Sequence, residues 1–320
     1  MSLSRHIHPG WGPLDDLDGW LNDWCARAGA HRSVAGKSVE GRPIPMVEVG
    51  PTDAPTVLLT GLVHGIELVG ALALLRLLER WVAQPCPRLR LVALPVVNPD
   101  AFALNHRRIG QGQRASRRSN LRGVDLNRNF ARLGRRSRHP FAGSTRPGRP
   151  YYIGPQAFSE PETRAVAEVA TRVRPQLSLG FHSFGELLVY PWAHRADPHP
   201  RTPEYLHLAE AFTAAQGKDP YAIRTAHAFY PTVGDLDDWL DHELGTLAYT
   251  VEVSRPCARL LHPGRALNPF FWMNPLDPEG AIAPAVEGSL GLLDAFAGAP
   301  AAARRPVQTP PPGATALAAR

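Results

Sequence analysis

The stretch TVLLTGLVHGIELVGALALLRLLERW, residues 56–81, decides the fold class. Residues 56–61 form a short apolar run typical of a buried strand, and residues 68–82 repeat apolar positions at helical spacing. The turn between these segments holds two ionisable side chains, His64 and Glu67. Since burying a charge without a partner is costly, each of them needs a partner. We expect the glycine between them to let the chain turn tightly.

Strands alternate with helices along most of the remaining chain. Further strands are expected at 90–97, 176–183 and 246–254, and further helices at 158–173, 202–217 and 285–298. The first of these helices has a capping signal, because Ser159 precedes acidic residues and Pro161. This alternation predicts an α/β fold, a single domain with a mixed, mostly parallel β-sheet flanked by helices on both faces.

The ends of the chain differ in composition from its middle. We expect an N-terminal extension over residues 1–19, one domain over residues 20–297, and a disordered tail rich in proline and alanine over residues 298–320. No run of about 18 apolar residues suggests a membrane span. The first twenty residues lack the apolar core of a secretion signal, which favours a cytoplasmic location.

Three cysteines are present in a chain of 320 residues, 44% of them hydrophobic. Cys25, Cys86 and Cys257 are too few and too scattered for a disulfide framework or a clustered metal site. We expect each to be a small buried apolar side chain.

Positive charge is concentrated in one part of the chain. The net charge is +6, and thirteen arginines fall within residues 107–149. Such a run can bind nucleic acid or form solvated surface loops. The segment RRIGQGQRASRRSNLR, residues 107–122, has no aromatic residues on which bases would stack, so nucleic acid is not the favoured partner.

Polar side chains follow three of the expected strands. His64 and Glu67 follow the first, His182 ends another, and Glu252 lies in the last. Functional groups gather at the carboxyl ends of strands in such sheets. Two histidines and a carboxylate are a common ligand set for catalytic zinc, and a separate carboxylate can serve as general base. The other eleven histidines, such as His139, show no paired spacing and are interpreted as surface residues.

The stretch GVDLNRNF, residues 123–130, is too polar for a core strand. Asn127 and Arg128 suit the recognition of a carboxylate, because a guanidinium group presents a rigid pair of donors. Asp125 can orient a metal-bound histidine through the ring nitrogen that does not face the metal.

The chain resembles the zinc metallocarboxypeptidases of the carboxypeptidase A/B type, including the bacterial short-loop branch with its murein-peptide amidases. Seven blocks match in family order: SVEGRPI (38–44), HGIE (64–67), NPDAF (98–102), GVDLNRNF (123–130), GPQAFSEPETRAV (154–166), FHSF followed by LLVYPW (181–192), and YTVEV (249–253).

This resemblance implies one zinc ion held by His64, Glu67 and His182, with Glu252 as the general base that deprotonates the zinc-bound water. Asn127 and Arg128 would hold the terminal carboxylate of a peptide substrate, and Asp125 would support His64. The family's arginine that polarises the scissile carbonyl corresponds to Arg118. Arg117 and Arg122 lie close enough in sequence to be alternative assignments.

Three further features follow from the same resemblance. The mobile tyrosine of the family precedes a tryptophan by nine residues, which identifies Tyr230. Phe184 stands where the animal enzymes often have tyrosine, and its peptide bond with Ser183 is expected to be cis. Asp237 lies where members that prefer basic residues carry aspartate, so a cationic C-terminal side chain is expected.

Two related activities and one unrelated function remain open. A murein-peptide amidase would cut the D-glutamyl–diaminopimelate bond with the same residues. A deacylase of the aspartoacylase/succinylglutamate desuccinylase type shares the HG-x-E and DLNR motifs, but SEPETR and HSF favour the carboxypeptidase branch. The arginine-rich loops leave nucleic-acid binding as the non-enzymatic alternative.

Overall fold

The computed structural model describes residues 14–83, 88–256 and 267–300. Within them, eight strands form one mixed sheet in the order β1-β2-β4-β3-β5-β8-β6-β7. The strands are β1 (His31–Lys37), β2 (Pro43–Val49), β3 (Thr56–Gly61), β4 (Arg90–Leu94), β5 (Leu177–His182), β6 (Leu187–Tyr190), β7 (Ala222–Thr225) and β8 (Leu247–Glu252). The central strands β4, β3, β5 and β8 run parallel to one another, whereas β2 and β6 are antiparallel to their central neighbours.

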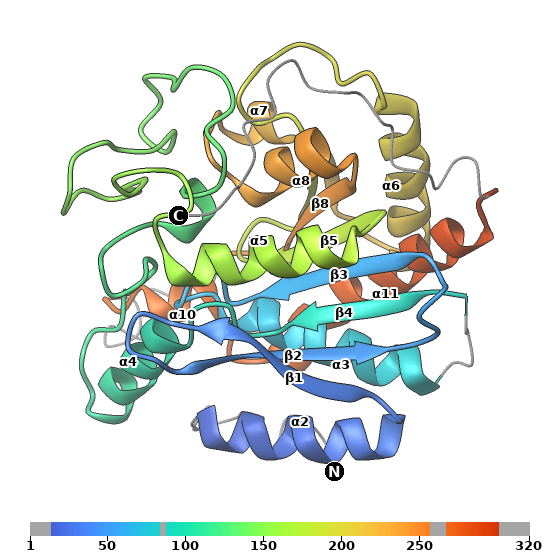
Figure 1. The fold of residues 1–320 in the computed structure, drawn as a ribbon, viewed down its shortest axis with the longest axis horizontal. Helices are drawn as coiled ribbons and strands as arrows, with labels where there is room; N and C mark the ends of the chain where they lie inside the picture. Colours follow the sequence, from blue (N-terminus) through green and yellow to red (C-terminus); the bar gives the residue numbers. More distant parts are fainter. Residues whose placement is uncertain (1–13, 84–87, 257–266, 301–320) are drawn as a thin grey trace.

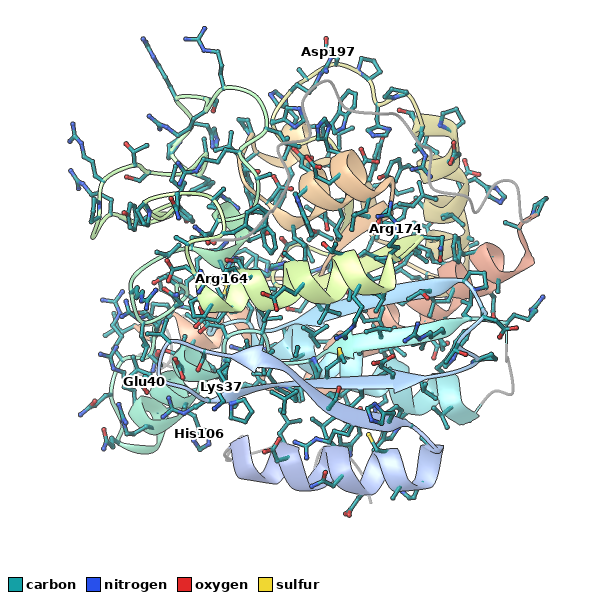
Figure 2. The ribbon with its side chains drawn as sticks, viewed as in Figure 1. Lys37, Glu40, His106, Arg164, Arg174 and Asp197 are labelled. Atoms are coloured by element: carbon teal, nitrogen blue, oxygen red, sulfur yellow. The ribbon has the colours of Figure 1, made fainter. Side chains whose placement is uncertain are left out.

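Helices cover both faces of this sheet (Figure 1). They are α2 (Leu14–Ala28), α3 (Leu68–Ala83), α4 (Pro99–Gly110), the 3₁₀ helix η1 (Leu126–Arg128), α5 (Pro161–Val173), α6 (Thr202–Gln216), α7 (Ala226–Phe229), α8 (Leu236–Leu244), α10 (Phe270–Met273) and α11 (Pro278–Gly298). One core cluster joins the sheet to α2, α3, α6 and α11, and a second joins the opposite face to α5 and α8. Figure 2 shows Arg164 and Arg174 at the two ends of α5, and both are exposed.

The predicted fold class is confirmed. The four strands expected from the sequence are the four central ones, and every residue of β3 and β5 is buried. Their parallel register pairs Gly61 with Phe181, so the segments that follow both strands leave the sheet on the same side, at the carboxyl ends of the parallel strands. This carboxyl-end edge carries the candidate site.

The strands that the sequence analysis missed lie at or near the sheet edges. β1 and β7 have mostly exposed or half-buried residues, so neither shows a continuous apolar run. β2 contains Pro43 and Pro45, which argue against a strand in sequence, and it lies next to the edge strand β1.

Two sequence expectations about boundaries are wrong. The extension expected over residues 1–19 runs into α2, which begins at Leu14 and buries Leu17 in the core. The N-cap position of helix α5 is Glu160 rather than Ser159; the Glu160 side chain makes no capping hydrogen bond, and the Ser159 hydroxyl group donates to the Glu160 carboxylate. Cys25 is buried, as expected, while residues 301–320 of the tail and the other two cysteines lie outside the described residues.

Candidate active site

Three side chains that the sequence singled out meet at one edge of the sheet. His64 lies in the turn after β3, Glu67 directly precedes α3, and His182 is the last residue of β5. The Nδ1 atoms of His64 and His182 are 3.1 Å apart, and each lies 2.9 Å from a Glu67 carboxylate oxygen. All three side chains are buried, and their ligand atoms lie within 4.8 Å of one another. This donor set and its compactness fit one zinc ion.

Two glycines allow the backbone segments at this edge to approach closely. A Cβ atom on Gly65 would lie 2.3 Å from the Cβ of Ala101, and one on Gly70 would lie 2.7 Å from the carbonyl oxygen of Phe181. Gly65 therefore packs the histidine turn against α4, and Gly70 packs α3 against β5. Gly65 lies in a tight turn closed by a hydrogen bond from the Glu67 backbone to the His64 carbonyl oxygen, as expected, and it is not among the glycines with a positive φ.

Asp125 and Arg118 contact the metal trio, as we call His64, Glu67 and His182. His64 Nε2 lies 3.1 Å from Asp125 Oδ1, on the side of the ring away from the other ligands. Arg118 donates from Nε to Asp125 and from Nη1 to Glu67, at 3.0 and 2.7 Å. The contact between His64 and Asp125 fixes the orientation of the His64 ring, as expected for a metal-binding histidine.

Charge pairing governs the pKa values of these groups. Burial alone would raise the pKa of the Glu67 carboxyl, but His64 and Arg118 outweigh it and hold the pKa well below its usual value. The Asp125 carboxyl behaves in the same way, because Arg118 and His64 overcome its burial and lower its pKa. Burial lowers the pKa of His182. The site thus favours ionised carboxylates and a neutral His182, which are the forms that bind metal.

The competing arginines point elsewhere. Arg117 donates to the carbonyl oxygen of Leu121, and Arg122 lies 3.7 Å from Glu160. Arg118 lines the cleft described next, and the other two do not. The structure therefore brings Arg118, among these three, to the metal ligands.

The trio forms the floor of a cavity of about 580 Å³. Glu252, which ends β8, pairs in register with His182 and lines this cavity. Its side chain is buried, and burial together with the nearby Glu67 charge raises the Glu252 pKa well above its usual value. A carboxylate that binds protons readily beside a metal site is suited to general-base chemistry.

Asn127 and Arg128 form the wall of the cavity. They lie in η1, which begins where the Asp125 side chain accepts a hydrogen bond from the Asn127 backbone. Arg128 is only 1% exposed, and its guanidinium donates to the carbonyl oxygens of Phe141 and Asn127. Within the described residues it forms no ion pair with a carboxylate. A buried guanidinium without an anionic partner, facing a cavity, is suited to bind an anionic group.

Aromatic residues surround this guanidinium. The Arg128 side chain lies 5.7 Å from the ring centre of Tyr230, and Arg118 lies 5.5 Å from that of Tyr151. His139 stacks on Tyr230 with 6.4 Å between ring centres, and Phe141 packs edge-on against Tyr230. Burial raises the pKa of Tyr230 to about 12. The sequence analysis treated His139 as a surface residue; it is exposed but also lines the cavity.

Asp237 lines the same cavity from the first turn of α8. The hydroxyl group of Thr250 donates to Asp237 Oδ2 at 2.6 Å. Burial raises the pKa of Asp237 to about 8. A second carboxylate that the sequence analysis did not identify, Asp235, also lines the cavity and caps α8. Burial and the nearby Asp238 raise the Asp235 pKa to about 6.

The peptide bond between Ser183 and Phe184 is cis, which confirms that expectation, and Phe184 lines the cavity. A second cis bond joins Pro191 to Trp192. One further expectation is wrong: His199 is not a surface residue. It is buried, and its Nε2 lies 2.8 Å from the Asp241 carboxylate.

Comparison with known proteins decides the family. A family model described as zinc carboxypeptidase matches residues 28–271. The chain belongs to the zinc carboxypeptidase family. This membership makes it a zinc-dependent hydrolase of peptides, and it agrees with the histidine–glutamate–histidine site in the structure.

The regions aligned with similar proteins cover most of this zinc carboxypeptidase. Carboxypeptidase B of Astacus astacus is 27% identical over 264 residues, covering 75% of this chain and 84% of the relative. Bovine thrombin-activatable fibrinolysis inhibitor, solved with a tick carboxypeptidase inhibitor, has the same fold, with a TM-score of 0.72, 20% identity, and coverage of 89% and 95%. The murein-tripeptide amidase of Escherichia coli O157 has a TM-score of 0.50, 22% identity, and coverage of 82% and 91%.

Proposed function

We propose that this zinc carboxypeptidase removes the C-terminal residue of peptides and prefers a residue with a cationic tip. The observation that carries the proposal is the buried guanidinium of Arg128, which faces the cavity beside the metal ligands without a carboxylate partner in the described part of the chain. A substrate's terminal carboxylate supplies that partner, and it places the last peptide bond next to the metal trio.

Each step of the hydrolysis has a residue suited to it. Asn127 accepts a hydrogen bond from Leu236 through Oδ1, which leaves its NH₂ group to help Arg128 hold the carboxylate. Zinc, when bound by the trio, lowers the pKa of a water ligand and polarises the scissile carbonyl. The Glu252 carboxylate takes the proton of the attacking water and delivers it to the departing amine. Arg118 directs positive charge to the developing oxyanion.

Asp237 supports the preference for a cationic tip. It lies with Thr250 in the part of the cavity that would receive the side chain of the terminal residue. A buried carboxylate binds an ammonium or guanidinium group and disfavours an apolar tip, which would leave the charge unpaired.

A murein-peptide amidase is the second candidate, because diaminopimelate also presents an amino group at the end of its side chain. Both activities need the terminal-carboxylate site and Asp237, so these residues do not separate them. The family match does not favour a deacylase of the aspartoacylase type. No helix of the described residues is long and apolar enough to cross a membrane. The cytoplasmic location expected from the start of the chain stays a prediction.

One experiment tests the proposed function. The zinc-loaded protein is incubated with a peptide library and with murein peptides, and the products are identified by mass spectrometry. We expect release of single C-terminal residues, with lysine and arginine ahead of apolar residues, and no release from C-terminal amides. Release of acyl groups from amino acids, or cleavage of internal peptide bonds only, would contradict the proposal. The His182→Ala variant is the inactive control.

A further inference from the structure

A second hollow adjoins the catalytic cavity. It has a volume of about 390 Å³, and four arginines line it: Arg108, Arg117, Arg118 and Arg149. We call it the arginine hollow. Its wall also contains Ser116, Ser119 and Tyr151. Arg118 and Tyr151 line both the hollow and the catalytic cavity, so the two spaces are neighbours.

Three of these arginines lack an anionic partner. Arg108, Arg117 and Arg149 form no ion pair with a carboxylate within residues 14–83, 88–256 and 267–300. Among the residues that the structure describes, the buried Nε atom of Arg117 has no hydrogen-bond partner, and its guanidinium donates only to the carbonyl oxygen of Leu121. Burial and the nearby Arg108 charge lower the pKa of Arg117. Arg149 is exposed and Arg108 and Arg117 are half-buried, so an anion that enters the hollow meets guanidinium groups that no carboxylate of the described residues neutralises.

The carboxylate that also lines the hollow is already engaged. Asp125 contacts His64 and the Nε of Arg118, and it accepts a hydrogen bond from the backbone of Asn127. It therefore has little capacity left for a further cation. The hollow remains a concentration of positive charge beside the metal ligands.

The position of the hollow determines which part of a substrate can reach it. The residues that would hold the terminal residue, Asn127, Arg128 and Asp237, line the catalytic cavity and not the hollow. Arg118 separates the two spaces and contacts Glu67 of the metal trio. A peptide anchored by its terminus at Arg128 thus extends past the metal with its upstream residues toward Arg118.

We propose that the arginine hollow binds a carboxylate carried by the substrate upstream of the scissile bond. The preferred substrate then has an acidic residue upstream of that bond and a cationic C-terminal residue. This inference rests on the proposed function and adds a requirement to it. Guanidinium groups bind carboxylates through two parallel hydrogen bonds, and neighbouring arginines strengthen such binding. The closeness of a peptide-binding cavity favours a carboxylate as the occupant. A further hollow shares Arg149 and Tyr151 and continues the basic surface through Arg136, Arg138 and Arg146, so nucleic acid is the alternative that the test must separate.

A matched set of peptides tests the inference. Each is acetylated, consists of four alanines followed by a C-terminal lysine, and carries glutamate or glutamine at one of the alanine positions. At one position we expect kcat/KM to be about 10-fold higher with glutamate than with glutamine, as for a charge-assisted hydrogen bond. About 1 M salt should reduce this ratio, because the Debye length falls to ~3 Å.

Three variants locate the effect. Arg108→Gln and Arg149→Gln should each bring the glutamate-to-glutamine ratio close to one. The control is Arg107→Gln, which alters the exposed neighbour of Arg108 outside the hollow and should keep the ratio.

A binding measurement separates this inference from the proposed function. Fluorescently labelled glutamate and glutamine peptides are titrated with the Glu252→Gln variant, and anisotropy gives their affinities. Tighter binding of the glutamate peptide, lost in Glu252→Gln/Arg108→Gln, supports the hollow even if no peptide is hydrolysed. Equal affinities, or equal rates at every position in an active enzyme, overturn it. The inference is also overturned, in favour of nucleic acid, if Arg108→Gln and Arg149→Gln weaken the binding of a single-stranded oligonucleotide but leave peptide binding unchanged.

Discussion

Glu252 is the buried carboxylate of the cavity for which the described residues provide no hydrogen-bond partner. It is 6% exposed, and its pKa is raised by burial and by the charge of Glu67. A structural role would call for a bonded partner, whereas a residue that exchanges protons with substrate needs access to the cavity. This environment supports the proposed role of Glu252 as general base.

Replacing Glu252 tests this interpretation. Glu252→Gln should lower kcat by about 10²–10⁴-fold, because an amide cannot take up the proton of the attacking water. Zinc content, measured by plasma mass spectrometry, and Tm should remain close to those of the unchanged protein. Activity within a few-fold of the unchanged enzyme would remove Glu252 from the mechanism.

Asp237 should make stability depend on pH. Its pKa is about 8 in the folded protein, above the ordinary value of 3.8. Between these values the unfolded chain has released a proton that the folded chain retains, so stability falls as pH rises, by at most about 1.4 kcal/mol per pH unit. Asp237→Asn should raise Tm at pH 8 and leave it nearly unchanged at pH 4. The exposed Asp53→Asn variant is the control.

The same carboxyl should make specificity depend on pH. Only ionised Asp237 attracts a cationic tip, so the ratio of kcat/KM for peptides ending in lysine and in phenylalanine should rise from pH 6 to pH 8. Asp237→Asn should lower this ratio by about 10-fold or more and remove its rise with pH. A preference for phenylalanine in the unchanged enzyme would mean that Asp237 does not set specificity.

Most of the site could be predicted from the sequence because its residues lie in short motifs. His64 with Glu67, and Asp125 with Asn127 and Arg128, are each close together in the chain. Asp235, His139, Phe141 and Tyr151 were missed because the cavity brings them together from separate loops. Apart from their place in the fold, nothing in their local sequence distinguishes them from ordinary loop residues.

At the scale of elements, burial decides which strands can be recognised. The central strands β3 and β5 are buried along their whole length and so appear in sequence as continuous apolar runs. The edge strands β1 and β7 have a face or an edge in solvent, which removes that signal. Helix α8 is not among the helices expected from the sequence; acidic residues dominate its start, where Asp235 forms a helix cap.

Two helical glycines should respond in opposite ways to alanine. A Cβ atom on Gly291 of α11 would lie 2.5 Å from the Cβ of Ala215 and 2.8 Å from the carbonyl oxygen of Ala211, both on α6. Gly291→Ala should therefore destabilise the protein by about 1–3 kcal/mol through overpacking. Gly19 of α2 is exposed with no atom within 4 Å of an added Cβ, so Gly19→Ala should stabilise it by about 0.5–1 kcal/mol. Urea unfolding of both variants measures the difference, and stabilisation by Gly291→Ala would contradict the close packing of α6 on α11.

At the scale of the whole molecule, the sheet brings distant motifs to one edge. β3, β5 and β8 lie side by side and parallel, so the chain segments at residues 64, 182 and 252 meet although they are far apart in sequence. Alternating strands and helices predict such a parallel centre. They do not predict the strand order, which depends on how the crossovers pack, nor the antiparallel additions β1, β2 and β6.

Because the metal ligands come from separate parts of the sheet edge, zinc should stabilise the whole fold. His64 and Glu67 lie between β3 and α3, and His182 ends β5, so these residues adopt their common geometry only in the folded chain. A ligand that binds only the folded state stabilises it by about 2.7 kcal/mol at 100 times its Kd. Removing zinc with a chelator should therefore lower Tm by several degrees, and Tm should then rise with the logarithm of added free zinc. His182→Ala should show a much weaker dependence of Tm on zinc, whereas Asp53→Asn should keep the full response. Equal responses of the unchanged protein and His182→Ala would show that zinc binds elsewhere.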